Sequence, residues 1–334
     1  MNLFDDNQLD PPEPNFDAQP SGSDALASPS PEPLPPPLGG DPISYAALSP
    51  LPKSNCYLPE DLRISWSWIH LLLFAFFGFI SLIVVQFSLA IYFIPTSRHF
   101  ANNEEFQQFV FSKPFFAIGS MVIWEASLIL FLYVTIAVLP NAPFWRSLGW
   151  RKLNPPDPSV SRNPWVYLFS GCGLSIGVFL VTAQTKAPEN APIEELLKHR
   201  TTMFLFMAMA VVFAPLVEET LFRGYLFPLL ARFSSALARS LGAECSTAIH
   251  RGGAASIVLT GVLFGLVHGY QLGWSRTLVL SLTVVGIIFT YVRARSGTVY
   301  ASYLLHLGYN STIALASIVG FIATKGFTHM PPGH

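Results

Sequence analysis

The stretch VFAPLVEETLFRG, residues 212–224, places two adjacent carboxylates and one guanidinium inside a run of apolar residues. It belongs to a longer apolar run, 202–231, which exceeds the ~20 residues that an α-helix needs to cross a membrane. A charged side chain inside such a span costs about 2.5–3.5 kcal/mol on insertion scales and usually serves a function. The stretch therefore predicts a membrane helix built around a polar site.

The composition of the whole chain is also suited to a membrane. The chain is 51% hydrophobic and 12% charged, whereas soluble domains carry roughly 25% charged residues. We predict an all-α fold, a polytopic transmembrane helical bundle of seven spans, with eight as the alternative. The apolar runs that predict these spans are Trp66–Ile94, Phe115–Leu139, Trp165–Thr182, Thr202–Ala231, Ala254–His268, Leu278–Val292 and Val299–Ile322.

The amino-terminal residues 1–61 differ in composition from everything that follows. Fourteen of the 28 prolines lie at or before Pro59, and the segment has ten acidic residues against a single basic one, Lys53. Such a segment cannot bury enough apolar surface to fold. We predict a disordered, Pro-rich, acidic tail.

The distribution of Lys and Arg predicts the orientation of the spans. With the tail inside, eleven basic residues fall on inner segments and seven on outer ones. Basic residues favour the cytoplasmic side, so we expect a cytosolic tail on an integral protein of the cell membrane. We expect the lipid bilayer as a partner, and no nucleic acid.

The two carboxylates of the deciding stretch have different surroundings. Adjacent helical residues differ by about 100° around the axis, so Glu218 and Glu219 face different ways. Glu219 and Arg223 stand at i,i+4 and are suited to a structural ion pair, which leaves Glu218 without a partner on its own helix. Pro215 frees a backbone carbonyl nearby, which only protein or water can satisfy. Glu125, in the second span, is interpreted as a helix-packing residue.

Two later apolar runs carry further polar side chains. One reads Phe264-Gly265-Leu266-Val267-His268, and the other reads His306-Leu307-Gly308-Tyr309-Asn310. Alone, each histidine is better explained by a hydrogen bond within or between helices. Together with Glu218, however, four polar residues converge from three apolar helices, and Gly261, Gly265 and Gly269 allow close helix approach.

These motifs resemble those of the CAAX prenyl endopeptidase and bacteriocin-processing family of glutamic intramembrane proteases. The family pattern is Glu-Glu-x-x-x-Arg, Phe-x-x-x-His and His-x-x-x-Asn on separate membrane helices. Here it is matched, in order, by Glu218-Glu219-x-x-x-Arg223, Phe264-x-x-x-His268 and His306-x-x-x-Asn310. The resemblance covers roughly residues 196–322. It implies N-terminal transmembrane helices at 62–195 and a catalytic membrane domain at 196–334. The segment Leu148-Gly149-Trp150-Arg151 also looks like one found upstream in such proteins.

The resemblance implies a reaction and assigns roles. Glu218, helped by His268, is expected to activate water for peptide hydrolysis, and His306 and Asn310 are expected to stabilise the oxyanion. Glu219, Arg223 and Phe264 are supporting residues in this interpretation. The implied substrate is a membrane-associated protein or peptide, lipidated in some members, cut at a CAAX-type carboxyl terminus or a leader peptide. Neither a cofactor nor a metal is expected.

Two other classes of function stay open. Glu218, His268 and His306 are a possible two-His, one-Glu ligand set for a zinc-dependent intramembrane metalloprotease, although no His-Glu-x-x-His helix exists. The second alternative is a non-catalytic membrane scaffold, or an immunity protein that has kept the fold.

The expected spans also raise a geometric difficulty. If the runs 202–231 and 254–268 both cross the bilayer, Glu218 lies near the inner surface and His268 near the outer. At ~1.5 Å per residue, the difference in depth can exceed about 10 Å; the alternative is that the fifth helix begins inside the membrane-spanning body.

Overall fold

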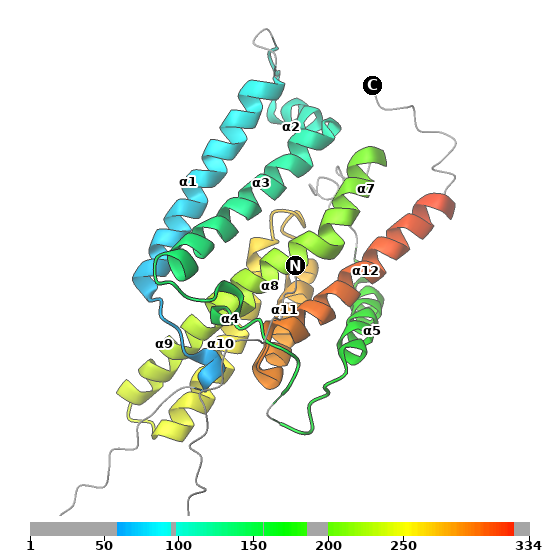
Figure 1. The fold of residues 1–334 in the computed structure, drawn as a ribbon. Coiled ribbons are helices and arrows are strands. Elements are labelled where there is room, and N and C mark those ends of the chain that lie inside the picture. The colour runs from blue at the N-terminus through cyan, green and yellow to red at the C-terminus, as the bar shows by residue number, and fades with distance from the viewer. Residues whose placement is uncertain (1–58, 95–97, 156, 186–199, 324–334) are drawn as a thin grey trace, which may run out of the picture. The chain divides into compact units, whose positions relative to one another are not determined.

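The computed structural model describes residues 59–94, 98–155, 157–185 and 200–323 (Figure 1). The predicted disordered tail lies outside these residues, apart from its last three positions. There, Glu60–Leu62 forms a short 3-10 helix, and Leu62 packs against Phe227 and Ala231. The folded part therefore begins slightly before the predicted boundary at residue 61.

Helices account for all the regular structure in the described residues, as predicted. In chain order, the α-helices and π-helical segments (η) are α1 Trp68–Phe93, α2 Asn103–Ser112, α3 Pro114–Leu132, η3 Tyr133–Val138, α4 Phe144–Ser147, α5 Pro164–Thr182, α7 Arg200–Ala208, η4 Met209–Phe213, α8 Ala214–Glu219, η5 Thr220–Leu226, α9 Phe227–Ser240, α10 Cys245–Val267, α11 Arg276–Ser296 and α12 Val299–Ala323.

Seven of the described helical stretches are long and apolar enough to cross a membrane, which confirms the predicted count. Large apolar side chains also face outward, where contact with water would be unfavourable. On α1, for example, Phe76 and Phe87 are each about two-thirds exposed (66% and 67%). Apolar surface of this extent marks contact with another apolar phase. The chain is an integral membrane protein.

The fourth and fifth spans are longer than the sequence predicted. The fourth is one continuous helical stretch of 41 residues, Arg200–Ser240, or about 62 Å at α-helical rise. It continues nine residues beyond the predicted end at Ala231, and α10 begins nine residues before the predicted start at Ala254. The two helices therefore turn at residues 241–244 and pack together as a long antiparallel hairpin.

The register of this hairpin removes the expected difference in depth. Gly252 of α10 lies against the backbone of Ser235 of α9. The helices are antiparallel. His268, sixteen residues after Gly252, therefore lies opposite Glu219, sixteen residues before Ser235. The expected difference in depth is absent, because the nearest side-chain atoms of Glu218 and His268 lie 3.7 Å apart. The difficulty arose because the end of the fifth run was placed near the outer surface, whereas His268 lies opposite the middle of the 41-residue helical stretch.

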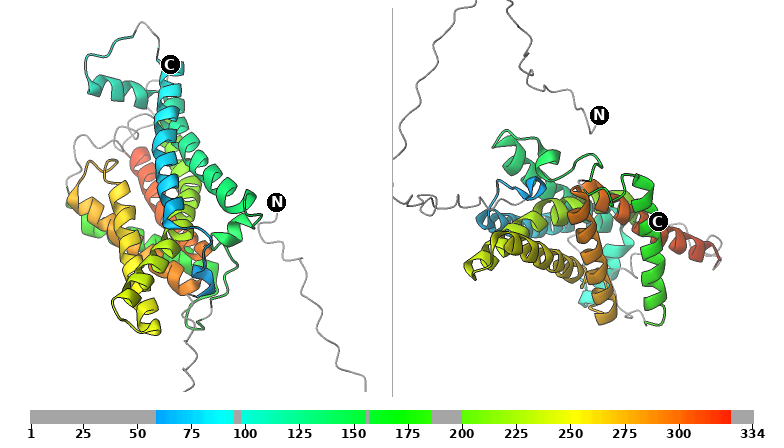
Figure 2. Two further views of the ribbon diagram at one scale, coloured as in Figure 1. Left: turned by 90° about the vertical axis from the view of Figure 1, so that its left-hand side faces the viewer. Right: turned by 90° about the horizontal axis from the view of Figure 1, so that it is seen from below.

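Close helix packing depends on glycines at two contacts. Where α5 crosses α12, a side chain at Gly171 would collide with the carbonyl of Leu305, and one at Gly308 with the carbonyl of Leu168. Between α10 and α11, Gly261 packs against Ile287. Figure 1 shows the α5–α12 pair beside the α10–α11 pair, and Figure 2 gives the same arrangement from two further sides.

The three glycines that were predicted to allow helix approach do not all do so. Gly261 and Gly265 lie in the α10–α11 contact, Gly265 against Thr283. Gly269 follows the end of α10, in the turn toward α11, where it lies against the ring of Trp274. Its part in the fold is to make room for that turn.

Candidate active site

The helix that carries Glu218 and Glu219 contains two π-helical segments. The six-residue segment α8 holds both carboxylates and is flanked by the π-helical segments η4 and η5. π-Helical turns are rare and occur frequently at functional sites. Glu219 is fully buried, whereas the side chain of Glu218 is 21% exposed. The two carboxylates face different surroundings, as predicted.

Glu218 lies between two imidazoles from two other helices. Its Oε1 is 3.7 Å from Nε2 of His268, at the end of α10, and its Oε2 is 3.9 Å from Nε2 of His306, on α12. Both distances are too long for direct hydrogen bonds. The carboxylate is therefore close to both rings and still free to accept a hydrogen bond from a small molecule.

Both rings are fixed by the nitrogen that points away from Glu218. Nδ1 of His268 is 2.7 Å from the carbonyl oxygen of Phe264, and Nδ1 of His306 is 3.0 Å from Oε1 of Glu219. A carbonyl or carboxylate oxygen can only accept, so each Nδ1 carries the proton of its bond. In the neutral form, each ring therefore presents the lone pair of Nε2 to Glu218.

The predicted ion pair between Glu219 and Arg223 is confirmed. Nη1 of Arg223 lies 3.1 Å from Oε1 of Glu219, and both side chains are fully buried. The guanidinium also donates to the carbonyl of Gly286 and to the hydroxyl of Thr290 on α11. A buried charge is tolerated where it is paired and fully hydrogen-bonded, so these contacts explain how the arginine is accommodated.

Phe264 joins the ion pair to the histidines. The centre of its ring lies 4.4 Å from the guanidinium carbon of Arg223, within cation–π range. The same ring is 4.7 Å from the ring of His268 and 6.0 Å from that of His306. The predicted supporting residue thus contacts three of the polar side chains.

Asn310 satisfies the carbonyl that a proline leaves free. Its Nδ2 donates a 2.7 Å hydrogen bond to the carbonyl of Ala210. Ala210 lies in η4, five residues before Pro215, and the proline has no N–H for the π-helical bond. One amide hydrogen of Asn310 is used in this way, and the other is left for a second acceptor.

The residues of the site fall within a region that matches a known protein family. Residues 200–312 match the model of the Rce1-like family, described as type II CAAX prenyl endopeptidase Rce1-like. The chain carries an Rce1-like domain. The matched residues include all the motif positions above, from Glu218 to Asn310. No curated protein and no solved structure matches the chain. The family is one of proteases.

The segment before the Rce1-like domain braces its central helix. In that segment, Nε1 of Trp150 donates to the hydroxyl of Thr220, directly after Glu219. Leu148 lies against Gly224, where a larger residue would meet the Leu148 carbonyl. The sequence singled out residues 148–151 by resemblance alone, and these contacts give the segment a structural part.

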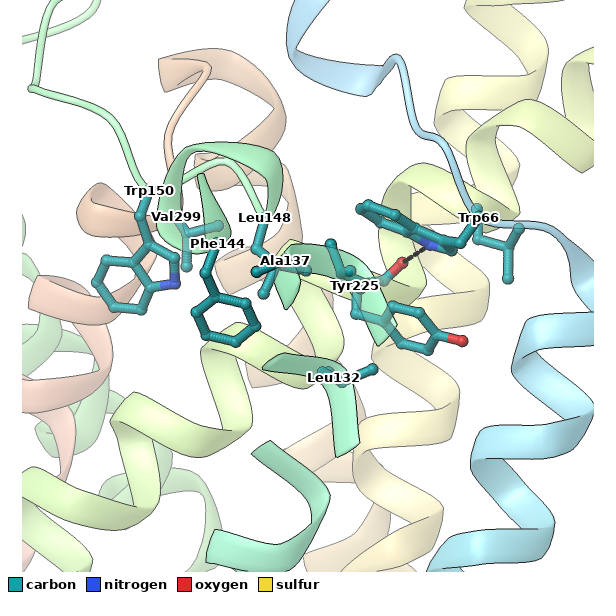
Figure 3. Close-up of a cluster of buried hydrophobic side chains, with 10 residues drawn as sticks. Trp66, Leu132, Ala137, Phe144, Leu148, Trp150, Tyr225 and Val299 are labelled. Carbon is teal, nitrogen blue, oxygen red and sulfur yellow. Dashed lines mark hydrogen bonds between the residues drawn. The ribbon is translucent and has the colours of Figure 1, made fainter. Parts of the chain in front are cut away.

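A cluster of buried side chains that includes Leu148 extends to the other side of η5. Figure 3 shows Leu148, Phe144 and Val299 on one side of the cluster and Trp66 with Tyr225 on the other. Nε1 of Trp66 donates to the carbonyl of Tyr225, and the Tyr225 hydroxyl bonds to Nδ1 of His70 on α1. The winding of η5 is thus held from both sides.

A cavity of about 640 Å³ lies between the Rce1-like domain and the preceding helices α3 and α5. The four predicted catalytic residues, Glu218, His268, His306 and Asn310, all line it. Most of the wall is apolar and comes from α3, α5, η4, α11 and α12. Such a volume is typical of a pocket for a peptide segment or a small molecule.

Glu125 of α3 also lines this cavity, which the sequence did not suggest. It was interpreted as a helix-packing residue, and it also lines the cavity that Glu218 lines. The signal in the sequence was its charge within a span. The direction of this charge depends on how α3 is rotated about its own axis, which cannot be read from the sequence.

Among the described residues, no group of three His, Cys, Asp or Glu side chains is placed to hold a metal ion. Glu218, His268 and His306 are the zinc ligand set considered from the sequence. Oε1 of Glu218 is 3.7 Å from Nε2 of His268, and Oε2 of Glu218 is 3.9 Å from Nε2 of His306.

Proposed function

We propose that this protein is an intramembrane endopeptidase in which Glu218 activates water for attack on a peptide bond. The observation that supports this most directly is the position of Glu218 between Nε2 of His268 and Nε2 of His306, at 3.7 and 3.9 Å. A polar gap of this width is the kind that a bridging water fills. A water held there would be hydrogen-bonded to its base before the substrate arrives.

The reaction follows in two steps. Glu218 takes a proton from the water as its oxygen attacks the carbonyl carbon of the substrate, which produces a tetrahedral oxyanion. The carbon–nitrogen bond then breaks, and Glu218 or His268 returns the proton to the leaving amine. Phe264 holds His268 through its carbonyl oxygen, so that Nε2 stays directed at Glu218 throughout.

Asn310 and His306 stabilise the oxyanion in this proposal. Asn310 supplies the amide hydrogen that its bond to Ala210 leaves over. His306 donates from Nε2 only when the ring carries both protons, because Nδ1–H already bonds to Glu219. The charge of Glu219 then stabilises the imidazolium. Preorganised donors of this kind are typically worth about 2.7–4 kcal/mol each in the transition state.

The substrate in this proposal is a membrane-associated protein or peptide, with or without a lipid modification. CAAX-type carboxyl-terminal processing and removal of a leader peptide both fit the apolar cavity and the family. We also propose that residues 196–334 form the catalytic part and 62–195 a supporting part. The protein would reside in the cell membrane with its amino-terminal tail in the cytosol.

The test replaces Glu218 by Gln, which keeps the size and polarity of the side chain but removes the base. Membranes containing the wild-type protein are compared with membranes containing Glu218→Gln, and the termini of their proteins are labelled and sequenced. We expect new termini in the wild type only, with equal amounts of folded protein. Glu244→Gln, at an exposed turn between α9 and α10, is the matched control and should behave as wild type. Identical termini in all three samples would contradict the proposal and favour a non-catalytic scaffold.

A further inference from the structure

The mechanism above leaves one carboxylate of the cavity unused. Glu125 lies on the face of α3 that packs against the helix of the active site. One turn before it, Met121 packs against a cluster that includes Met209 and Ala214, and Ala214 in turn lies one turn before Glu218. Glu125 and Glu218 therefore each lie one turn after a residue of the same packed cluster, and both line the cavity.

Glu125 differs from the other two acids in its contacts with the described residues. Glu219 is bonded to Arg223 and His306, and Glu218 lies beside two imidazoles. Oε2 of Glu125 is buried and lacks a hydrogen-bond partner in the part of the chain that the structure describes, and the same is true of Oε2 of Glu219. Glu219, however, is held through its Oε1 by Arg223 and His306, whereas no described side chain is hydrogen-bonded to Glu125. A helix-packing residue would be bonded across the helix contact. An ionised acid without a partner is costly in a membrane span, and a cation from outside the chain would stabilise its charged form.

The charges around the cavity favour a cation as that partner. Glu125 and Glu218 both line the cavity, so two acidic side chains adjoin the same space. None of the described residues that line the cavity is Lys or Arg. The single guanidinium of the site, Arg223, is already held by Glu219, Thr290 and Gly286. A mobile positive group in the cavity would therefore be attracted to Glu125.

We propose that Glu125 determines specificity by binding a basic side chain of the substrate close to the bond that is cut. The inference rests on the proposed function, because it takes the cavity as the place where the peptide is held. An Arg or Lys side chain suits the site in a second way: its apolar stem can lie along the apolar wall while its charged end reaches the carboxylate. A carboxylate and a guanidinium also form two parallel hydrogen bonds, which fixes the register of the peptide.

A different role for Glu125 makes a different prediction. If the carboxyl group instead delivered a proton to the leaving amine, its loss would slow every substrate alike. A residue that binds a basic side chain affects the choice between substrates. The ratio of two rates therefore separates the two roles.

The experiment uses the full-length protein in phospholipid vesicles and palmitoylated Leu/Ala peptides that become fluorescent on cleavage. Arg is placed at successive positions along the peptide, and each Arg peptide has a twin with citrulline, which has nearly the same shape without the charge. We expect kcat/KM for at least one Arg position to exceed that of its twin by about 10-fold or more. In Glu125→Gln, the ratio should fall close to one, whereas Glu244→Gln should keep it.

Charge reversal provides a second variant. Glu125→Lys should prefer a peptide with Glu at the same position over its Gln twin. Thermal unfolding in detergent establishes that each variant is folded. An Arg preference that survives in Glu125→Gln would overturn the proposal, and so would an equal loss of rate on both twins.

Binding separates this inference from the proposed function. The affinity of the same peptides is measured with Glu218→Gln protein, alone and combined with Glu125→Gln, so that no cleavage is required. An Arg preference in binding that disappears with Glu125 supports the inference, even if the wild-type protein hydrolyses none of the peptides. Equal affinity for Arg and citrulline peptides, or no binding of either, would contradict the inference and leave hydrolysis to be judged by the termini.

Discussion

Nδ1 of His306 donates a 3.0 Å hydrogen bond to Oε1 of Glu219, the same oxygen that accepts from Arg223. The sequence suggested only an ion pair within one helix for Glu219. In the structure, this acid also fixes the ring whose Nε2 faces Glu218. Glu219 therefore links the structural ion pair to the candidate catalytic residues, and its loss should affect both.

Replacing Glu219 by Gln should lower kcat by about 100-fold and change KM little. Gln keeps an oxygen that can accept from His306, but it removes the charge that stabilises the doubly protonated ring, and that charge matters in the transition state. Steady-state kinetics measured on a peptide that the wild-type protein cleaves tests this. If kcat falls only in proportion to the loss of folded protein, Glu219 is a structural residue.

Replacing Arg223 by Ala should reduce stability as well as activity. The change leaves Glu219 buried without its cation, and breaking such a pair typically costs about 3–5 kcal/mol. Thermal unfolding in detergent measures the loss, with Arg239→Ala, at the exposed end of α9, as a control of the same type. Equal unfolding temperatures of Arg223→Ala and wild type would show that the ion pair does not support the fold.

Asn310→Ala should reduce kcat by about 100-fold or more, and His306→Ala should act similarly. Because both donors serve one oxyanion, the double variant should lose less than the sum of the single losses. The Asn310 variant should also lose about 1–3 kcal/mol of stability, since the carbonyl of Ala210 is left without its donor. Losses that simply add would show that the two residues act independently.

Chelators should leave the activity unchanged if the glutamate mechanism is correct. Glu218, His268 and His306 are also the ligand set of the zinc alternative, so metal content is measured on the same samples. Stoichiometric zinc that disappears in His306→Ala but stays in Asn310→Ala would overturn the proposed mechanism in favour of a metalloprotease.

Gly171→Ala should destabilise the protein, whereas Gly173→Ala on the same helix should not. A Cβ at Gly171 would collide with the backbone of α12 at Leu305, and one at Gly173 would meet nothing. In the open position, Ala is favoured in a helix over Gly by about 1 kcal/mol. The unfolding temperatures of the two variants should therefore move in opposite directions, and a shift in the same direction would contradict the α5–α12 contact.

The sequence predicted the class of fold and the members of the site, but not how the members meet. Hydropathy located seven spans because each has an apolar core. It ended the fourth run at Ala231 because Arg232 and Arg239 follow, although α9 continues as an amphipathic helix with one buried face. Hydropathy measures composition, and a polar helix that extends a span is invisible to it.

The motifs likewise named the residues without their contacts. The spacing of Glu219 and Arg223 was enough to predict their ion pair, because four residues along a helix fix the distance. The bond from His306 to Glu219 spans 87 residues, and the position of Glu125 depends on how α3 is rotated. Neither quantity is local, so neither can be read from spacing.

The long α9–α10 hairpin also determines what surrounds the turn that follows it. Since His268 ends α10 opposite the middle of a 41-residue helix, the turn Gly269–Ser275 lies beside α8, well below the ends of α1 and α7 (Figure 1). Backbone that is not helical is not tolerated against hydrocarbon, and the rings of Tyr270 and Trp274 are exposed there, as interfacial aromatics are. A bilayer thins beside an element that is too short for it. We therefore expect the membrane to be locally thin on this flank, so that headgroups and bulk water approach within a few residues of Glu218 and hydrolysis needs no channel to supply it.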